Sequence, residues 1–264
     1  MLTALVDGDP IVYICGFAAQ SSTWRCVEDD SIHATKTKAR EHAENNKLNT
    51  ALISEIIDYE PLSHALHLVK NCLNLIQSRT GCSEMRIFLT GSANFRDKIA
   101  TIRPYKGNRP DRKPYWYKEI RDYLIEVRGA EVVNGIEADD ALGIFSEGNK
   151  TVICTIDKDL DMIEGLHFNY QKDEMYDVSP ENALRNFYMQ LLTGDVTDNI
   201  QGVPGVGKKT ARALLKHCTD EEDMYWTCLK EYCRTHEKAF EALLENARLL
   251  WMLREPKQQW EPPV

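Results

Sequence analysis

The chain has 264 residues, of which 43% are hydrophobic and 28% charged, and its formal net charge at pH 7 is −9. A chain of this length and composition can bury a globular core, as one large domain or as a domain with a smaller lobe. It has no run of about 18 apolar residues that could span a membrane, and its first residues lack a basic segment and a signal core, so we expect a cytoplasmic protein. Its eight cysteines form no CxxC pair and no Cys/His knuckle, which favours reduced thiols over a zinc site or disulfides.

Short apolar segments rich in β-branched residues predict buried strands, and helical patterns lie between them. The strands are expected at 2–7, 85–91 and 150–157, and the helices near 61–79, 117–126 and 138–147. This alternation predicts an α/β fold with a mainly parallel sheet. Ligands bind beyond the carboxyl ends of the strands in such sheets, so Asp7 and Asp157 mark the expected site.

From about residue 180 the pattern becomes helical. Helices are expected at 180–193, 208–217, 221–234 and 237–253. We therefore expect an α/β core over 1–179 and a helical C-terminal lobe over 180–264.

Basic charge is concentrated in two places although the whole chain is acidic. Residues 96–121 contain nine Lys/Arg and three Asp/Glu, and residues 202–217 contain four Lys/Arg and no acid. The segment 97–116 also carries three prolines and the aromatic residues Tyr105, Tyr115 and Trp116. Such a segment can be a solvated surface loop, or a mobile basic element that contacts single-stranded nucleic acid by charge and stacking.

Carboxylates recur in four short motifs. These are VDGD (Asp7, Asp9), IEADD (Glu137, Asp139, Asp140), IDKDLD (Asp157, Asp159, Asp161) and GDVTD (Asp195, Asp198). One such aspartate is commonly a helix cap, but several at one sheet edge repel one another unless cations neutralise them. Oxygen ligands suit Mg²⁺ or Mn²⁺, and two such ions about 4 Å apart are the usual clamp for phosphodiester hydrolysis.

The stretch QGVPGVGKKTARAL (201–214) has the glycine and lysine spacing of a nucleotide-binding P-loop. Lys209 stands where that loop needs a serine or threonine to bind Mg²⁺, and no strand precedes the stretch, so we reject this interpretation. The stretch instead fits a helix–hairpin–helix, whose glycine turn presents backbone N–H groups to a DNA backbone.

With these motifs the chain resembles the 5′ nuclease (flap endonuclease and 5′–3′ exonuclease) superfamily, in the form of the phage exonucleases and of the 5′ nuclease domain of bacterial DNA polymerase I. The most specific segment is LLTGDVTDNIQGVPGVGKKTARALL (191–215). VDGD near the start, FRDKIATIRPYKGNR (95–109), NGIEADDALG (134–143) and TIDKDLDMI (155–163) follow the order of the family, so the resemblance covers about 1–217. It implies a PIN-like α/β core with an arch or gateway over 96–126. It also implies a helix–three-turn–helix that binds DNA over 195–217.

The resemblance also implies roles for individual residues. The metal ligands would be Asp7, Glu137, Asp139, Asp140, Asp157, Asp159, Asp195 and Asp198, and Lys106 and Arg109 would contact the scissile phosphate. The remaining DNA contacts would be Arg96, Arg103, Gly202, Gly205, Gly207, Lys208, Lys209 and Thr210. The implied cofactors are two Mg²⁺ or Mn²⁺ ions, with a K⁺ ion at the 202–207 turn. The implied partner of the monomeric, membrane-free enzyme is DNA with a 5′ end or a duplex–single-strand junction, or an RNA–DNA hybrid at a primer.

One departure from the family pattern concerns the strand that reads RIFLTGSANFR. The family has an aspartate at its end, whereas residues 89–94 contain no carboxylate, which implies weaker or different binding of one metal ion. Asp9 is our candidate to compensate, and Asp161 is expected to be structural. The departure leaves open a DNA-binding protein that has lost catalysis. An RNA-specific PIN nuclease is a further alternative, against which the hairpin argues. The compact length without a fused polymerase suggests a phage protein.

Overall fold

The computed structural model describes residues 2–110 and 112–263. Contacts within the chain divide it into two compact units, which do not coincide with the boundary expected at residue 180. Unit 1 comprises Met1–Pro10, Leu73–Asp111 and Leu124–Val264, and unit 2 comprises Ile11–Cys72 and Arg112–Tyr123. Three helices cross the division, namely α1 (Gly8–Ala18), α3 (Leu62–Thr80) and α5 (Tyr117–Glu126).

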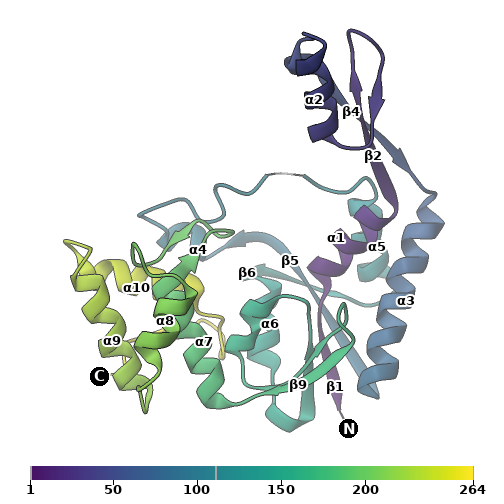
Figure 1. Cartoon of the computed structure of the whole chain (residues 1–264). Helices are drawn as coiled ribbons and strands as arrows, with labels where there is room; N and C mark the ends of the chain where they lie inside the picture. Colours follow the sequence, from purple (N-terminus) through teal and green to yellow (C-terminus); the bar gives the residue numbers. More distant parts are fainter. Residues whose placement is uncertain (1, 111, 264) are drawn as a thin grey trace. The chain divides into compact units, whose positions relative to one another are not determined.

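Unit 1 contains a six-stranded sheet (Figure 1). Its strands are β1 (Thr3–Asp7), β5 (Glu84–Asn94), β6 (Glu131–Gly135), β7 (Thr151–Cys154), β8 (Gly165–Asn169) and β9 (Glu174–Val178). Their order is β6-β5-β1-β7-β8-β9, and every neighbouring pair is parallel except β8 and β9. Helices flank this sheet, so the expected α/β fold with a mainly parallel sheet is confirmed.

The buried strands form because their side chains are apolar on both faces. Leu5, Phe88 and Ile153, from β1, β5 and β7, share a core with Ala141 and Leu142 of α6 (Ala138–Phe145). A strand that is covered on both faces reads as a continuous apolar run, as these three do. The sheet therefore fixes where each of the three strands ends, and with it the position of the residues that follow.

The C-terminal part of unit 1 is helical, as expected. Its helices are α7 (Pro180–Thr193), α8 (Lys208–Leu215), α9 (Glu221–Cys233) and α10 (Ala239–Leu250), with the short α4 (Arg96–Ile99) beside α10. Ser179 caps α7 with its side chain, and Gly194 ends the helix with a φ of 70°. Phe187, Tyr188 and Tyr232 are buried in the core that these helices share with Trp260 near the C-terminus.

Unit 2 contains a three-stranded antiparallel sheet that the sequence analysis did not predict. Its strands are β2 (Gln20–Cys26), β3 (Ile32–His33) and β4 (Ile53–Tyr59), in the order β3-β2-β4. Helix α2 (Lys36–Asn45) packs on this sheet around the small core of Cys26, Ala39 and Ala43. The strand β2 reads QSSTWRC and buries only Cys26 fully, so it lacks the apolar pattern of a core strand.

The cysteines are all free thiols, and five of them are buried in the core. Within the part of the chain that the structure describes, no helix combines the length and the apolar composition needed to cross a membrane.

Candidate functional site

Carboxylates from three strand ends meet at one edge of the unit 1 sheet. Asp7 is the last residue of β1, and Asp157 follows β7, where its Oδ1 accepts a 2.9 Å hydrogen bond from the backbone N of Asp159. Glu137 and Asp139 lie at the start of α6, shortly after β6. The parallel strands bring these four residues together because their carboxyl ends share one edge.

A tight turn after α7 supplies two more carboxylates. Here β10 (Gly194–Asp195) pairs antiparallel with β11 (Ile200–Gln201). Asp195 Oδ1 accepts hydrogen bonds from the backbone N of Thr197 at 2.7 Å and of Asp198 at 3.2 Å, which fixes the turn. A cavity of about 880 Å³ lies between this turn and the sheet edge. Its lining includes Glu137, Asp139, Asp157, Asp159, Asp195 and Asp198, together with Lys106 and Arg109.

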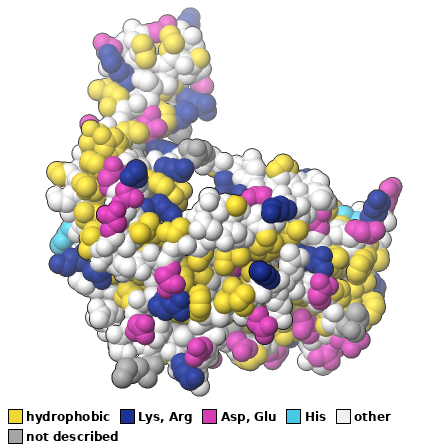
Figure 2. Space-filling model, turned by 180° about the vertical axis from the view of Figure 1, so that it is seen from behind, with side chains coloured by type: hydrophobic (Ala, Val, Ile, Leu, Met, Phe, Trp, Pro, Cys, Tyr) yellow, Lys and Arg dark blue, Asp and Glu magenta, His cyan; other side chains and the backbone are white. Residues whose placement is uncertain are grey.

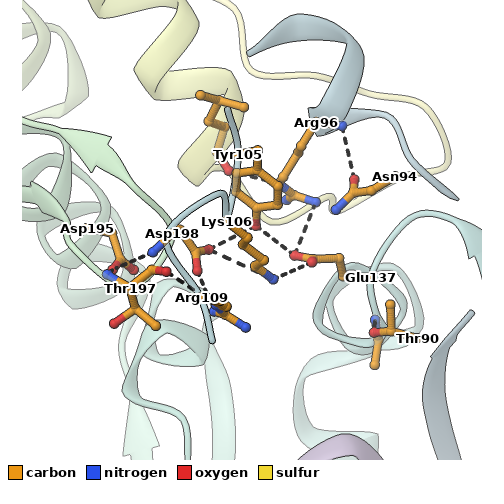
Figure 3. A network of polar contacts seen from close by, with 12 residues as sticks. Thr90, Asn94, Arg96, Tyr105, Lys106, Arg109, Glu137, Asp195, Thr197 and Asp198 are labelled. Atoms are coloured by element: carbon orange, nitrogen blue, oxygen red, sulfur yellow. Dashed lines mark hydrogen bonds and ion pairs between the residues drawn. The ribbon is translucent and has the colours of Figure 1, made fainter. Parts of the chain in front are cut away.

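A basic loop contacts both groups of carboxylates (Figure 3). The hydroxyl of Tyr105 lies 2.9 Å from Glu137 Oε2 and 2.9 Å from Asp198 Oδ2. Lys106 forms an ion pair with Glu137, and Arg109 forms one with Asp198. Sequence reasoning treated Tyr105 only as a stacking aromatic. Its role as a link between two acidic segments depends on contacts between residues far apart in the chain, which no local pattern reveals.

Burial and mutual repulsion raise the pKa values of several of these carboxyls. Burial raises the pKa of Asp139 well above its usual value, and the nearby Asp7 and Asp157 add to the effect. Burial and the neighbouring Asp157 raise the pKa of Asp159 to about 7. Ionised carboxylates in such a site are unfavourable without a counter-charge, which divalent cations would supply.

The donor chemistry fits Mg²⁺ or Mn²⁺, because every candidate ligand is a carboxylate oxygen. Among residues 2–110 and 112–263, however, no three His, Cys, Asp or Glu side chains are arranged closely enough to hold a metal ion. Lys106 and Arg109 instead provide the counter-charge for Glu137 and Asp198. The carboxylates therefore suit the ions by donor type. Two of them, Glu137 and Asp198, form ion pairs with basic side chains in this structure.

Two predicted roles are corrected by a buried ion pair. Asp140 is 0% exposed, and its two oxygens accept hydrogen bonds from Arg96 at 2.7 and 2.9 Å. They also accept the backbone N–H groups of Glu137 at 3.0 Å and Leu253 at 3.1 Å. Asp140 thus has no oxygen left for a metal ion. Arg96 is only 3% exposed, so it cannot contact DNA either.

The same ion pair fixes the start of α6. Arg96 also donates hydrogen bonds to the carbonyl oxygens of Leu249 and Trp251, at 2.8 and 2.7 Å. It thereby joins α4, α6 and the segment after α10. Because α6 carries Glu137 and Asp139 into the cavity, Arg96 and Asp140 are positioning residues for the acidic site.

The glycine turn at 202–207 lies beside the acidic cavity. Arg103, whose Nη2 is 2.6 Å from Gln201 Oε1, lines a second cavity of about 610 Å³ together with this turn. Gly205 has a φ of 81°, and Gly207 is the N-cap of α8. The first residues of α8, Lys208, Lys209 and Thr210, are exposed. These positions suit contacts with a phosphate backbone, and the DNA-binding role of the turn stays a prediction.

Gly202→Ala should destabilise the fold by about 2 kcal/mol, as is typical of overpacking. An added Cβ would lie 2.2 Å from Gly194 N and 2.5 Å from Leu192 O, so the turn would have to open. Gly207→Ala is the matched control, because its Cβ meets nothing within 4 Å and its φ is −93°. Thermal unfolding of both variants checks this prediction, and equal melting temperatures would contradict it.

The missing strand-end carboxylate has a structural correlate. An added Cβ at Gly91 would lie 2.4 Å from Asn134 Oδ1 and 2.6 Å from Val133 O, so a side chain is excluded there. The backbone N of Thr90 donates a 3.0 Å hydrogen bond to Asp9 Oδ2. Asp9 therefore places a carboxylate beside Thr90 of β5, although its role as a ligand stays a hypothesis. Asp161 accepts a 2.8 Å hydrogen bond from the hydroxyl of Tyr176, which suits a structural role.

Parts of this chain are similar to known nucleases and polymerases. A 5′-3′ exonuclease of Buchnera aphidicola subsp. Schizaphis graminum is 31% identical over 160 residues, covering 53% of this chain and 54% of the relative. The chain is similar to 5′–3′ exonucleases. DNA polymerase I of Pseudomonas aeruginosa is 31% identical over 150 residues, which is 49% of this chain and 16% of the polymerase. The chain spans about half the length of the curated exonucleases that it matches, and no protein-family model matches it.

Solved structures show the same fold. A bacteriophage T5 flap endonuclease in a complex with DNA and metal ions matches with a TM-score of 0.60 and 14% identity, over 94% of this chain and 89% of that chain. The T5 protein co-crystallised with metal ions matches with a TM-score of 0.52 and 14% identity, over 95% and 86%. The resemblance to the 5′ nuclease superfamily is thereby confirmed. The helix–three-turn–helix itself stays a prediction.

Proposed function

We propose that the protein is a metal-dependent 5′–3′ exonuclease and 5′ flap endonuclease that hydrolyses the phosphodiester bonds of DNA. The observation that carries this proposal is the cavity in which carboxylates from separate segments face Lys106 and Arg109. The relatives named 5′-3′ exonuclease and the T5 flap endonuclease support the same activity.

The residues that would hold two Mg²⁺ or Mn²⁺ ions are Asp7, Glu137, Asp139, Asp157, Asp159, Asp195 and Asp198. When bound, these ions would activate a water molecule and stabilise the charge on the phosphate. On substrate binding, Lys106 would leave Glu137 and Arg109 would leave Asp198, and both would contact oxygens of the scissile phosphate. There they would stabilise the negative charge that develops in the transition state. Tyr105 would keep the acidic segments at their spacing.

The duplex would bind at the 202–207 turn and the start of α8. Backbone N–H groups at the helix N-terminus and the exposed Lys208 and Lys209 would contact phosphates, which gives binding without base specificity. We also propose that this turn binds a K⁺ ion. Arg103 lies beside this turn and would contact the same strand. Hydrolysis near the 5′ end of the strand would leave a 5′-phosphate on the product. The strand that is cut would be DNA or an RNA primer.

A second candidate is a structure-specific DNA-binding protein without catalysis. The observation in its favour is the crowded Gly91, which removes a carboxylate that the family has at this strand end. The ion pairs of Lys106 and Arg109 with the acids fit this candidate as well.

Cleavage of labelled flap, nicked, blunt and RNA-primed substrates distinguishes the two candidates. A nuclease should release short products in Mg²⁺ or Mn²⁺ and none in EDTA, with the flap or the free 5′ end cut first. Tight binding of the flap with intact substrate at every metal concentration would support the second candidate and refute the first.

A further inference from the structure

Unit 2 has an aromatic surface that consists of the exposed Tyr59 and Tyr115 and the partly buried Trp116. The rings of Tyr59 and Tyr115 are stacked, with centroids 3.7 Å apart and planes 10° apart, and Trp116 meets both edge-on. Tyr59 is 49% exposed and Tyr115 is 51% exposed, so the two rings form no part of a core. We propose that this aromatic surface binds single-stranded nucleic acid by stacking on its unpaired bases.

The aromatic surface is held in place before any ligand binds. The backbone N of Tyr115 donates a 2.7 Å hydrogen bond to Gln20 Oε1 on β2. The indole Nε1 of Trp116 donates a 2.8 Å hydrogen bond to the carbonyl oxygen of Glu60, just after β4. These bonds fix the Trp116 ring and the backbone of Tyr115, and a surface that is ordered before binding loses less conformational freedom, which favours affinity.

The strand register places further suitable side chains on the same face of the sheet. Gln20 pairs with Tyr59, Ser22 with Ile57 and Trp24 with Glu55, and alternate residues of a strand share a face. The core formed with α2 covers the end of this face near Cys26, while Ile57, nearer Tyr59, is 42% exposed. By the same alternation, the opposite face carries Ser21, Thr23 and Arg25 of β2 and Ser54, Ile56 and Asp58 of β4, and none of these six residues is aromatic.

Basic side chains lie along the aromatic face. Arg112 is half-exposed, pairs with Glu55 and lies 3.4 Å from Ser22 Oγ. Lys36 Nζ lies 5.0 Å from the ring centroid of Trp24. Figure 2 shows Lys and Arg side chains, as well as Asp and Glu side chains, next to hydrophobic ones in the part of the chain with α2, β2 and β4. The acids beside these groups include Glu55, which forms an ion pair with Arg112, Glu119 near Tyr115, and Glu60, which follows Tyr59. Lys36 is a cation of this face whose contact is with an aromatic ring.

This combination favours single-stranded nucleic acid over an apolar peptide. Exposed aromatic rings beside cations bind single strands of any sequence. Every base offers a flat face for stacking, and the phosphate backbone of the strand is negatively charged. A duplex keeps its bases stacked inside and cannot use such rings. The inference rests on the proposed nuclease function, because such an enzyme must hold a 5′ single strand. The binding test below does not depend on cleavage.

Fluorescence anisotropy in EDTA tests the inference with labelled oligo(dT) and oligo(rU) of about 12 nucleotides, within the usual site size. Tyr59→Ala and Tyr115→Ala should each weaken single-strand binding by about fivefold or more, as expected for one lost base stack. Tyr115→Phe, which keeps the ring, and Thr23→Ala, on the opposite face, should bind like the wild type. The DNA and RNA arms show which sugar the surface prefers.

An abasic strand of the same length separates stacking from charge. The affinity of the wild type for the abasic strand should be low. It should equal the affinity of the Tyr59→Ala/Tyr115→Ala double variant for the complete strand. Equal binding of abasic and complete strands to the wild type, or undiminished binding by the double variant, would overturn the inference. A wild type that binds strands in this way but never cleaves would refute the nuclease proposal alone. A wild type that cleaves while the alanine variants bind normally would refute only the aromatic surface.

Discussion

Asp157→Asn should lower metal-dependent cleavage by about 10³-fold while duplex binding stays unchanged, since losing about 4 kcal/mol of transition-state stabilisation has this effect on the rate. Asp157 follows β7 at the sheet edge and lies close enough to Asp139 and Asp159 to raise the pKa values of both. Asparagine keeps the side-chain oxygen that accepts the Asp159 N–H, but it removes the negative charge. The measurement is single-turnover cleavage of a 5′-flap substrate, with binding followed separately in EDTA.

Asp161→Asn is the matched control for this prediction. Asp161 also lines the acidic cavity, but its carboxylate is held by the Tyr176 hydroxyl, so we expect its loss to leave cleavage within about twofold of the wild type. If Asp157→Asn cleaved like Asp161→Asn, the proposed metal site would be in the wrong place.

Arg96→Met should destabilise the fold by about 3–5 kcal/mol, because it leaves the carboxylate of Asp140 buried and unpaired. At about 2–4 °C for each kcal/mol, the melting temperature should fall by about 6–20 °C. Cleavage should fall as well, since the start of α6 positions Glu137 and Asp139. Thermal unfolding followed by circular dichroism gives the stability, and the flap assay gives the activity.

The double variant Arg96→Met/Asp140→Leu tests whether Asp140 acts through Arg96. Replacing both members of a buried pair by apolar residues removes the unpaired charge, so the double variant should be more stable than Arg96→Met. Some cleavage should also return, because Asp140 is not among the proposed metal ligands. A double variant as unstable as Arg96→Met would contradict the view that the unpaired charge of Asp140 causes the destabilisation.

The sequence predicted those parts of the fold whose pattern is local. The apolar runs at 2–7, 85–91 and 150–157 became β1, β5 and β7, and the helical pattern at 180–193 became α7 with the same bounds. The sheet of unit 2 was missed because β2 is polar and is stabilised by pairing with β4 and by α2, which are distant in sequence. The parallel strand β8 was missed for a similar reason, since GLHFN is short and carries a histidine.

The candidate site shows the same limit. Motifs such as IEADD and GDVTD mark the acids that line the cavity, because each motif is short and its spacing is fixed by a helix start or a turn. The corrected residues, Arg96 and Asp140, are 44 positions apart, and their pairing depends on how α4 packs against α6 and the C-terminal segment. The resemblance implied a DNA contact for Arg96 and a ligand role for Asp140, and only the folded structure shows that the two are buried and paired.

The central claim is that the carboxylates of the unit 1 cavity hold divalent metal ions for hydrolysis. Calorimetric titration of the protein with Mn²⁺, without DNA and at neutral pH, measures this most directly. The account predicts two bound Mn²⁺ ions for the wild type and for Asp161→Asn, with at least one site lost or weakened by about tenfold or more in Asp157→Asn. No Mn²⁺ binding by the wild type, or unchanged binding in Asp157→Asn, would contradict it.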